Sequence, residues 1–152
     1  MGMRVYLDTN VYNRPFDDQT QPRIWLETLA FAVILQMVDA SSVTLVSSSL
    51  LEYENSRNPL LDRRRWVERC LADAGCHQLV DEDIRTRAED LERTGVSSLD
   101  ALHIACAEAA DSQFFLTCDD HLVSHYEGEL TVMSPVDFVI SEGGHYGSES
   151  NE

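Results

Sequence analysis

The chain contains no lysine, and its eleven basic residues are all arginine. Against them stand 27 acidic residues, so the formal net charge is −16. This charge argues against broad, non-specific binding of nucleic acid, because such binding depends on neutralising many phosphates with basic side chains. It leaves room for a nucleic-acid enzyme whose positive charge comes from metal ions and a local arginine patch.

Other signatures are missing as well. No string has the form GxxxxGK[ST] or GxGxxG, which argues against a nucleotide triphosphatase or a dinucleotide enzyme. The four cysteines form no CxxC pair, so we expect buried, reduced thiols. No secretion signal is visible, and the longest apolar run, residues 29–35, is too short to span a bilayer. We therefore expect a soluble, cytoplasmic protein with no membrane contact.

The pattern of apolar residues predicts one domain of the α/β class. With 152 residues and 43% hydrophobic content, the chain can build one substantial core. Runs of β-branched and aromatic residues predict strands at 3–7, 43–47, 114–117 and 130–133. Helical patterns separate them, which predicts a three-layer α/β/α sandwich with a central parallel sheet. We expect this domain to cover residues 3–140 and a disordered tail to cover 141–152.

The first long helix is predicted at 22–40, after a loop at 9–21 that is rich in turn-forming residues. Its apolar side chains cover more than one face: Trp25, Leu29, Phe31, Ile34, Leu35 and Val38. A helix of this kind must be buried on two sides or contact a partner. We therefore predict a homodimer contact through this helix.

Two aspartates follow predicted strands. Asp8 comes after the first strand, and Asp119 comes after the strand at 114–117. Ligands of open parallel sheets bind beyond the carboxyl ends of the strands, so both acids would lie at that edge. Clustered carboxylates are costly unless a cation lies between them. Each aspartate alone also has a purely structural interpretation, as a helix cap or a turn former.

Two further acids belong to predicted helices. Asp100 lies in the first turn of one helix, one turn before Ile104, where the helix dipole would also stabilise it. Glu54 follows Leu50 by four residues and shares its inward face, so we favour Glu54 as the buried acid. Glu52 points partly away and is the alternative.

Four strings in order along the chain resemble the PIN-domain family: LDTNV, SSSLLEYE, LDALHIACA and FLTCDDHL. This family includes VapC-like ribonucleases, the metal-dependent toxins of prokaryotic toxin–antitoxin pairs, and the resemblance runs over 3–138. By position it implies four catalytic, metal-binding acids, which are Asp8, Glu54 (or Glu52), Asp100 and Asp119. It also implies that Asn10 and Thr117 hold these carboxylates by hydrogen bonds.

The resemblance implies an endoribonuclease that hydrolyses RNA phosphodiester bonds with Mg²⁺ or Mn²⁺, and an antitoxin protein as its partner. One alternative is a phosphatase with Asp8 as nucleophile. Such enzymes usually have a second aspartate two residues later, where this chain has Asn10. The other alternative is a PIN-like module that binds a partner and has lost activity.

One basic cluster stands out, composed of Arg57, Arg63, Arg64, Arg65 and Arg69. These arginines either form a solvated helix face that pairs with neighbouring acids, or include phosphate contacts. The candidates for contact with RNA are Arg57, Arg63 and Arg64.

Three histidines, His103, His121 and His125, have no cysteine partner at the spacing of a zinc finger. We therefore interpret His103 as a core histidine that donates a hydrogen bond, in preference to a metal ligand.

Overall fold

The computed structural model of the chain describes residues 2–150, with the side chains of residues 2–143. Its five strands are all parallel and form one sheet in the order β3-β2-β1-β4-β5. The strands are β1 (Met3–Leu7), β2 (Val43–Ser48), β3 (Cys76–Gln78), β4 (Phe114–Leu116) and β5 (Thr131–Met133). The chain builds outward from β1 to β3 and then returns to the other side of β1. The strand order therefore reverses between β1 and β4.

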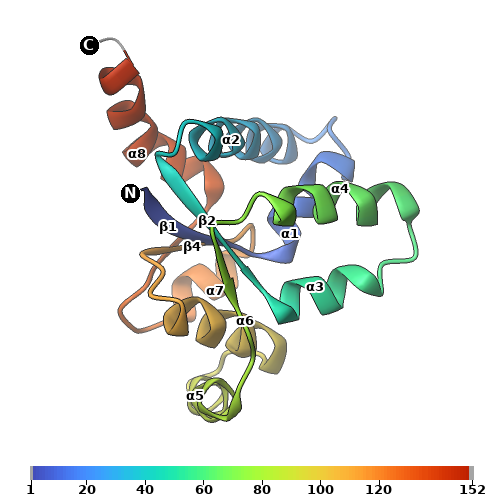
Figure 1. Ribbon diagram of the computed structural model, residues 1–152, viewed down its shortest axis with the longest axis vertical. Coiled ribbons are helices and arrows are strands. Elements are labelled where there is room, and N and C mark those ends of the chain that lie inside the picture. The colour runs from blue at the N-terminus through green and yellow to red at the C-terminus, as the bar shows by residue number, and fades with distance from the viewer. Residues whose placement is uncertain (1, 151–152) are drawn as a thin grey trace.

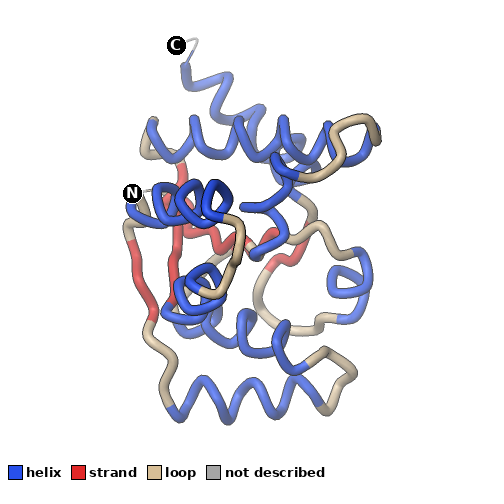
Figure 2. Tube along the Cα trace, turned by 90° about the vertical axis from the view of Figure 1, so that its right-hand side faces the viewer, coloured by secondary structure: helices blue, strands red, loops and turns tan. Residues whose placement is uncertain are grey.

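Helices cover both faces of this sheet. They are α1 (Thr9–Asn13), α2 (Pro22–Asp39), α3 (Ser49–Ser56), α4 (Leu61–Ala72), α5 (Glu82–Glu92), α6 (Ser98–Ala109), α7 (Asp120–His125) and α8 (Pro135–Ser150). Figure 1 shows α2, α4 and α8 on one side of the sheet and α5 and α6 on the other. The same layers are visible after a quarter turn in Figure 2. The predicted three-layer α/β/α fold is confirmed.

Residues 9–21 were predicted to form a loop. This prediction is wrong for the first half of the segment, which is helical. It contains α1 and a 3-10 turn, η1 (Arg14–Phe16). Asp8 caps α1 by accepting a hydrogen bond from the backbone N–H of Thr9, and Pro15 lies in the first turn of η1. Helix α7 is a second element that the sequence did not predict, and Asp119 caps it in the same way. These turn-forming residues start helices here, because an acid after a strand can cap the next helix.

Helix α8 packs along α2 and runs to Ser150. It therefore continues into 141–152, where the sequence favours a disordered tail. Residues 151–152 lie outside the described residues, and the domain boundary at 140 stays a prediction. None of the described helices is both long enough and apolar enough to cross a membrane.

The core fills the space on both faces of β1. Val5, Tyr6 and Leu7 are all fully buried, as expected for a central strand of a covered parallel sheet. On the α6 side, the ring of Tyr6 stacks on Phe115, with 5.3 Å between the ring centroids. On the α2 side, Phe31 meets aromatic rings from both α1 and α4 at nearly right angles. All four cysteines are free thiols.

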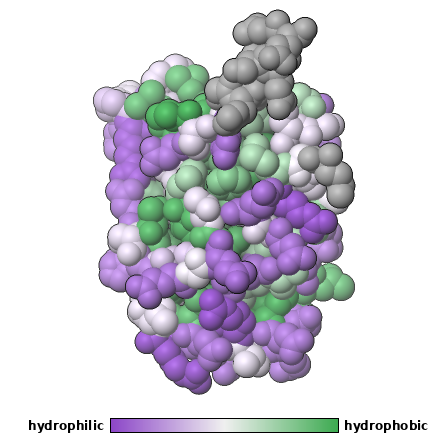
Figure 3. Space-filling model, turned by 90° about the vertical axis from the view of Figure 1, so that its left-hand side faces the viewer, coloured by the Kyte–Doolittle hydropathy of each residue, from purple (hydrophilic) through white to green (hydrophobic). Residues whose placement is uncertain are grey.

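Only part of the apolar surface of α2 is covered by the rest of the described chain. Phe31 and Ile34 are buried in the core, whereas three large side chains stay exposed, namely Trp25, Leu26 and Leu29. On the face of the molecule shown in Figure 3, hydrophilic residues surround separate hydrophobic patches, in keeping with the high charge. The exposed side chains of Trp25, Leu26 and Leu29 on α2 form a candidate contact surface.

Two isoleucines in helices provide a test of this packing. Ile34 in α2 is 0% exposed and Ile140 in α8 is 73% exposed. We expect Ile34→Ala to lower the free energy of unfolding by about 2–5 kcal/mol, because it leaves a cavity in the core. Ile140→Ala should change it by no more than about 0.5 kcal/mol. Urea denaturation measures both, and equal losses would contradict the observed packing of α2.

Candidate functional site

The carboxyl ends of β1 and β4 meet where the strand order reverses. A backbone hydrogen bond of 2.9 Å from the N–H of Asp8 to the carbonyl of Leu116 joins the two strand ends. Asp8 follows β1 and Thr117 follows β4, so their side chains lie together across the pair. In open parallel sheets, the crevice at such a point is where ligands bind.

Asp8 is only 6% exposed, and hydrogen bonds hold both of its carboxylate oxygens. Oδ1 accepts from the backbone N–H of Thr9 at 2.8 Å. Oδ2 accepts from Oγ1 of Thr117 at 2.9 Å and from Nδ2 of Asn10 at 3.2 Å. Asn10 also donates to Thr117 and accepts from the backbone N–H of Cys118, both at 3.1 Å. These bonds tie α1 and the ends of two strands around one carboxylate.

Burial raises the pKa of Asp8, because desolvation penalises the charged form. His103 and the hydrogen bonds from Thr117 and Thr9 lower this pKa, and the negative charge of Asp100 raises it. The net effect of these contributions is a raised pKa of Asp8. A cation bound beside Asp8 would therefore relieve an existing electrostatic penalty.

Asp100 and Asp119 line one cavity of about 460 Å³. Asp100 follows the cap residue Ser97 at the start of α6, and no described group hydrogen-bonds or ion-pairs with its carboxylate. Asp119 lies at the start of α7. Its backbone N–H donates to Oγ1 of Thr117 at 3.1 Å, and its Oδ1 accepts from the N–H of His121 at 2.9 Å. Thr117 thus connects Asp8 directly to the segment that bears Asp119.

The two glutamates of α3 have different environments. The side chain of Glu54 is 22% exposed, and its Oε1 accepts a hydrogen bond from Oγ1 of Thr9 at 3.3 Å and contacts Nε2 of His103. The side chain of Glu52 is 55% exposed and lies 3.5 Å from Nδ1 of His77. Helix α3 therefore turns Glu54 toward Asp8 and its neighbours, and turns Glu52 away from them.

His103 is buried and forms hydrogen bonds, as expected for a core histidine. Its Nδ1 lies 2.7 Å from the hydroxyl of Tyr6, which in turn lies 2.8 Å from Oγ of Ser48. Burial raises the pKa of Tyr6 well above its ordinary value, so this phenol stays protonated. The sequence did not predict roles for Tyr6, Ser48 or Thr9. The one available signal was the spacing of His103, three residues after Asp100 on the same helix.

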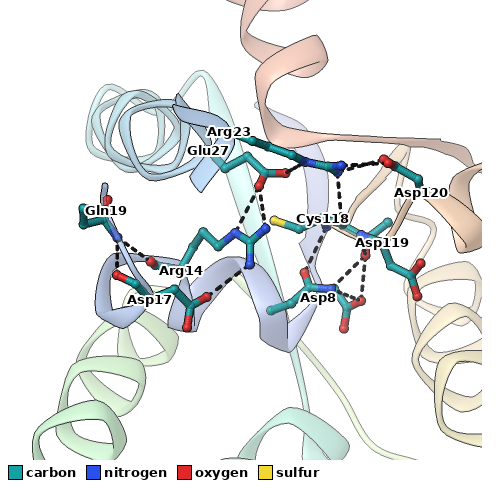
Figure 4. Close-up of polar contacts among 11 residues, drawn as sticks. Asp8, Arg14, Asp17, Gln19, Arg23, Glu27, Cys118, Asp119 and Asp120 are labelled. Carbon is teal, nitrogen blue, oxygen red and sulfur yellow. Dashed lines mark hydrogen bonds and ion pairs between the residues drawn. The ribbon is translucent and has the colours of Figure 1, made fainter. Parts of the chain in front are cut away.

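A second polar cluster lies beside Asp8 and is centred on Glu27 of α2 (Figure 4). Glu27 is 2% exposed, and its Oε1 accepts from Nε and Nη2 of Arg14 at 3.0 and 2.7 Å. Arg23 approaches the other oxygen at 3.5 Å. The guanidinium of Arg23 also holds both oxygens of Asp120, at 2.7 and 2.8 Å, and the carbonyl of Cys118, at 3.0 Å. Helix α2 thereby anchors the segment that contains Asp119.

This cluster was not predicted from the sequence, although one signal is present. Glu27 stands between Ile24 and Phe31 on the buried face of α2, where an acid needs a partner. Its partners come from positions far away along the chain, and spacing alone does not identify them.

The arginine cluster, which begins just after α3 and continues in α4, does not pair with neighbouring acids in the described part of the chain. Arg57 lies over the ring of Tyr53, with 5.6 Å from its Cζ to the ring centroid. Arg63 lies over the ring of Phe16 at 5.4 Å and donates to the carbonyl of the same residue. Arg64 donates to a backbone carbonyl at 3.0 Å. Among the described residues, no carboxylate thus neutralises the positive charges of these three guanidinium groups.

The donor atoms around Asp8 suit a hard divalent cation such as Mg²⁺ or Mn²⁺, because they are carboxylate oxygens. Asp8, Asp100 and Asp119 form no ion pair with an arginine among the described residues. In the same residues, however, no three His, Cys, Asp or Glu side chains are placed to hold one ion directly. The donor chemistry therefore fits a cation that is held by few carboxylates and by water, as Mg²⁺ commonly is.

The model of the PIN domain family matches residues 5–128, a range that contains all four candidate acids. The chain belongs to the PIN domain family. This confirms the resemblance inferred from the four strings. The phosphatase alternative gains no support from the geometry of this PIN domain, because Asn10, which stands where such enzymes usually have their second aspartate, uses its amide to hold Asp8 and Thr117.

Solved structures share this PIN fold at low sequence identity. FitAcB from Neisseria gonorrhoeae is 17% identical with a TM-score of 0.54, over 86% of this chain and 97% of that chain. FitAB bound to an IR36 DNA fragment is 19% identical with a TM-score of 0.57, over 87% and 95%. VapBC2 from Rickettsia felis, bound to a DNA fragment from their promoter, is 14% identical with a TM-score of 0.56, over 86% and 97%. No curated protein sequence matches the chain.

The raised pKa of Asp8 predicts an unusual pH dependence of stability in the metal-free protein. A carboxyl whose pKa is higher in the folded state binds more protons there, so stability falls as the pH rises through that window. Asp8→Asn removes this penalty. We expect the variant to melt above the wild type at pH 7, and the difference to shrink as the pH falls toward 3.8, the ordinary pKa of an aspartate.

Asp18→Asn is the control of opposite sign. Hydrogen bonds from Thr20 lower the pKa of the exposed Asp18, so its charge stabilises the fold above the ordinary pKa and this contribution is lost as the pH falls. That variant should melt slightly below the wild type at pH 7, and the gap should close in acid. If metal-free Asp8→Asn melts well below the wild type at pH 7, burial does not penalise the Asp8 charge.

Proposed function

We propose that this PIN domain is a metal-dependent endoribonuclease that hydrolyses RNA phosphodiester bonds with Mg²⁺ or Mn²⁺ and acts as the toxin of a toxin–antitoxin pair. Nuclease activity is what PIN domains generally have. The observation that carries the proposal is the Asp8 carboxylate. It is buried, oriented by donors at the point where the strand order reverses, and close enough to Asp100 for their charges to interact, without an arginine partner among the described residues.

Asp8, Asp100 and Asp119, with Glu54, would hold the cation directly or through water. When bound, it lowers the pKa of the attacking water and neutralises charge on the leaving oxygen. Thr117 and Asn10 fix both position and direction of the Asp8 carboxylate, so little reorganisation is needed during the reaction. The carboxylates would also repel an RNA phosphate that arrives without a cation.

RNA needs a positive surface as well, and the cluster of Arg57, Arg63 and Arg64 is the candidate. These side chains have no carboxylate partner in the described residues, and they stack on aromatic rings or bind backbone carbonyls. A guanidinium held in this way can still donate to phosphate oxygens. Because the net charge is −16, we expect contact with RNA to be local to this cluster.

We also propose an antitoxin protein as partner, in the cytoplasm. The similar structures FitAB and VapBC2 are each bound to a DNA fragment, and that of VapBC2 comes from the promoter. Their likeness to this chain supports a role in such a system. The net charge of −16 would accelerate association with a basic partner.

We further propose a homodimer through the exposed face of α2. Light scattering at micromolar concentration should give twice the chain mass of 17.2 kDa. The double variant Trp25→Ser, Leu29→Ser should give a monomer, because it removes apolar surface that the dimer would bury. Leu79→Ser, which changes an exposed leucine outside α2, should remain dimeric. A monomeric wild type would reject this contact.

The central prediction concerns the acids. Asp8→Asn, Asp100→Asn and Asp119→Asn keep the side-chain shape and remove charge, so metal-dependent cleavage of an RNA panel should fall by roughly a hundredfold or more. Glu54→Gln should behave in the same way. Glu52→Gln is the matched control on the same helix, and its activity should stay close to that of the wild type.

Melting curves with and without millimolar Mn²⁺ accompany these assays. They should show a higher midpoint with metal for the wild type and Glu52→Gln, and a reduced shift for the other variants. Equal cleavage by Asp8→Asn and the wild type would refute the nuclease mechanism. An inactive Glu52→Gln beside an active Glu54→Gln would reverse the assignment of the two glutamates. A wild type that binds an antitoxin but cleaves no RNA would be the inactive binding module.

A further inference from the structure

A continuous row of buried polar groups reaches Glu54 from the interior of the domain. The hydroxyls of Ser48 and Tyr6 are 2.8 Å apart, and the hydroxyl of Tyr6 is 2.7 Å from Nδ1 of His103. Nε2 of His103 then contacts Oε1 of Glu54. Ser48, Tyr6 and His103 are all buried, and they come from β2, β1 and α6. Three separate elements therefore converge on one glutamate of α3.

The carboxylate sets the direction of these hydrogen bonds. An ionised carboxylate can only accept hydrogen bonds, so Nε2 of His103 carries a proton and donates a hydrogen bond to Glu54. In the neutral imidazole, Nδ1 is then the acceptor for the O–H of Tyr6. The oxygen of Tyr6 can accept from Ser48, whose own oxygen accepts from the backbone N–H of Leu51 at 3.1 Å. In this arrangement each of these protons has one acceptor.

Because of this row of polar groups, the two carboxylate oxygens of Glu54 differ in their hydrogen-bond contacts. Oε1 has two neighbouring donors, Nε2 of His103 and Oγ1 of Thr9. Oε2 has no hydrogen-bond partner among the described residues. A glutamate has three rotatable side-chain bonds, so without such contacts its carboxylate would spend part of its time turned toward solvent. The contacts hold one oxygen inward and leave the other available.

We propose that His103 is a positioning residue of this enzyme, which fixes Glu54 through Oε1 so that Oε2 alone is presented to the site. The inference rests on the proposed ribonuclease function and assigns a role to a residue outside the four acids. His103 does not touch the substrate. It acts through Glu54, and Tyr6 and Ser48 keep its ring in the required orientation.

Two variants of His103 separate positioning from packing. In His103→Gln, the amide nitrogen reaches about as far as Nε2 and can still donate to Glu54, whereas the shorter side chain of His103→Asn reaches only as far as Nδ1. We expect His103→Asn to lower kcat by roughly tenfold or more with little change in KM, and His103→Gln to recover most of kcat. Both variants lose the ring, so their melting temperatures should fall together. Equal losses of kcat in the two variants would overturn the proposal.

A double-mutant cycle tests whether His103 acts through Glu54. In the Glu54→Gln background, His103→Asn should cause little further loss of kcat, because the group that it positions has already been changed. Multiplicative losses would mean that His103 acts independently of Glu54, and would overturn the proposal.

The third measurement needs neither RNA nor metal. In metal-free protein labelled with ¹⁵N-histidine, the NMR signals of His103, identified by their absence from His103→Gln, should show a proton on Nε2 that exchanges slowly with water. Glu54→Ala should make this exchange fast. A proton on Nδ1 with none on Nε2, or unchanged exchange in Glu54→Ala, would overturn the inferred contact. A wild type with the expected NMR pattern but without ribonuclease activity would reject the proposed function while supporting the contact.

Discussion

The site depends on one costly arrangement, a carboxylate placed in the interior at the end of the central strand. Burial of Asp8 is tolerated because hydrogen bonds occupy both oxygens, and these donors belong to α1 and to the end of β4. The same donors align the ends of the two strands. The same hydrogen bonds therefore offset the cost of burying the Asp8 charge and set the geometry of the crevice. Changing one of these donors would alter both.

The surrounding polar groups divide into an α2 side and an α6 side. On the α2 side, Glu27 neutralises Arg14 and orients Arg23, which holds the segment around Asp119. On the α6 side, His103 connects Glu54 to the interior. On each side a buried side chain, Glu27 or His103, helps to fix a partly accessible acid, Asp119 or Glu54. This is how a site can be rigid although its acids come from segments far apart in the sequence.

The sequence contained enough information for four of the five strands and for the position of Asp8 and Asp119 after two of them, because each of these strands is an apolar run with a recognisable period. The role of the four acids in binding a metal ion stays a prediction. The path of residues 9–16 was harder to predict, since Asn10 and Pro15 favour turns and also suit the start of a helix. The cluster around Glu27 was out of reach for a different reason. Its contacts join residues up to 97 positions apart, as between Arg23 and Asp120, and no local pattern encodes such a pair.

The alternation of side chains along β1 makes the core and the acidic crevice depend on the same strand register. Tyr6 and Asp8 are two residues apart, so they point to the same side of the sheet, and Val5 and Leu7 point to the other. A slip of one residue in the pairing of β1 would exchange these sets, which would bury a carboxylate under α2 and turn aliphatic side chains into the polar crevice. Misregistered molecules would therefore lose their core together with their acidic crevice.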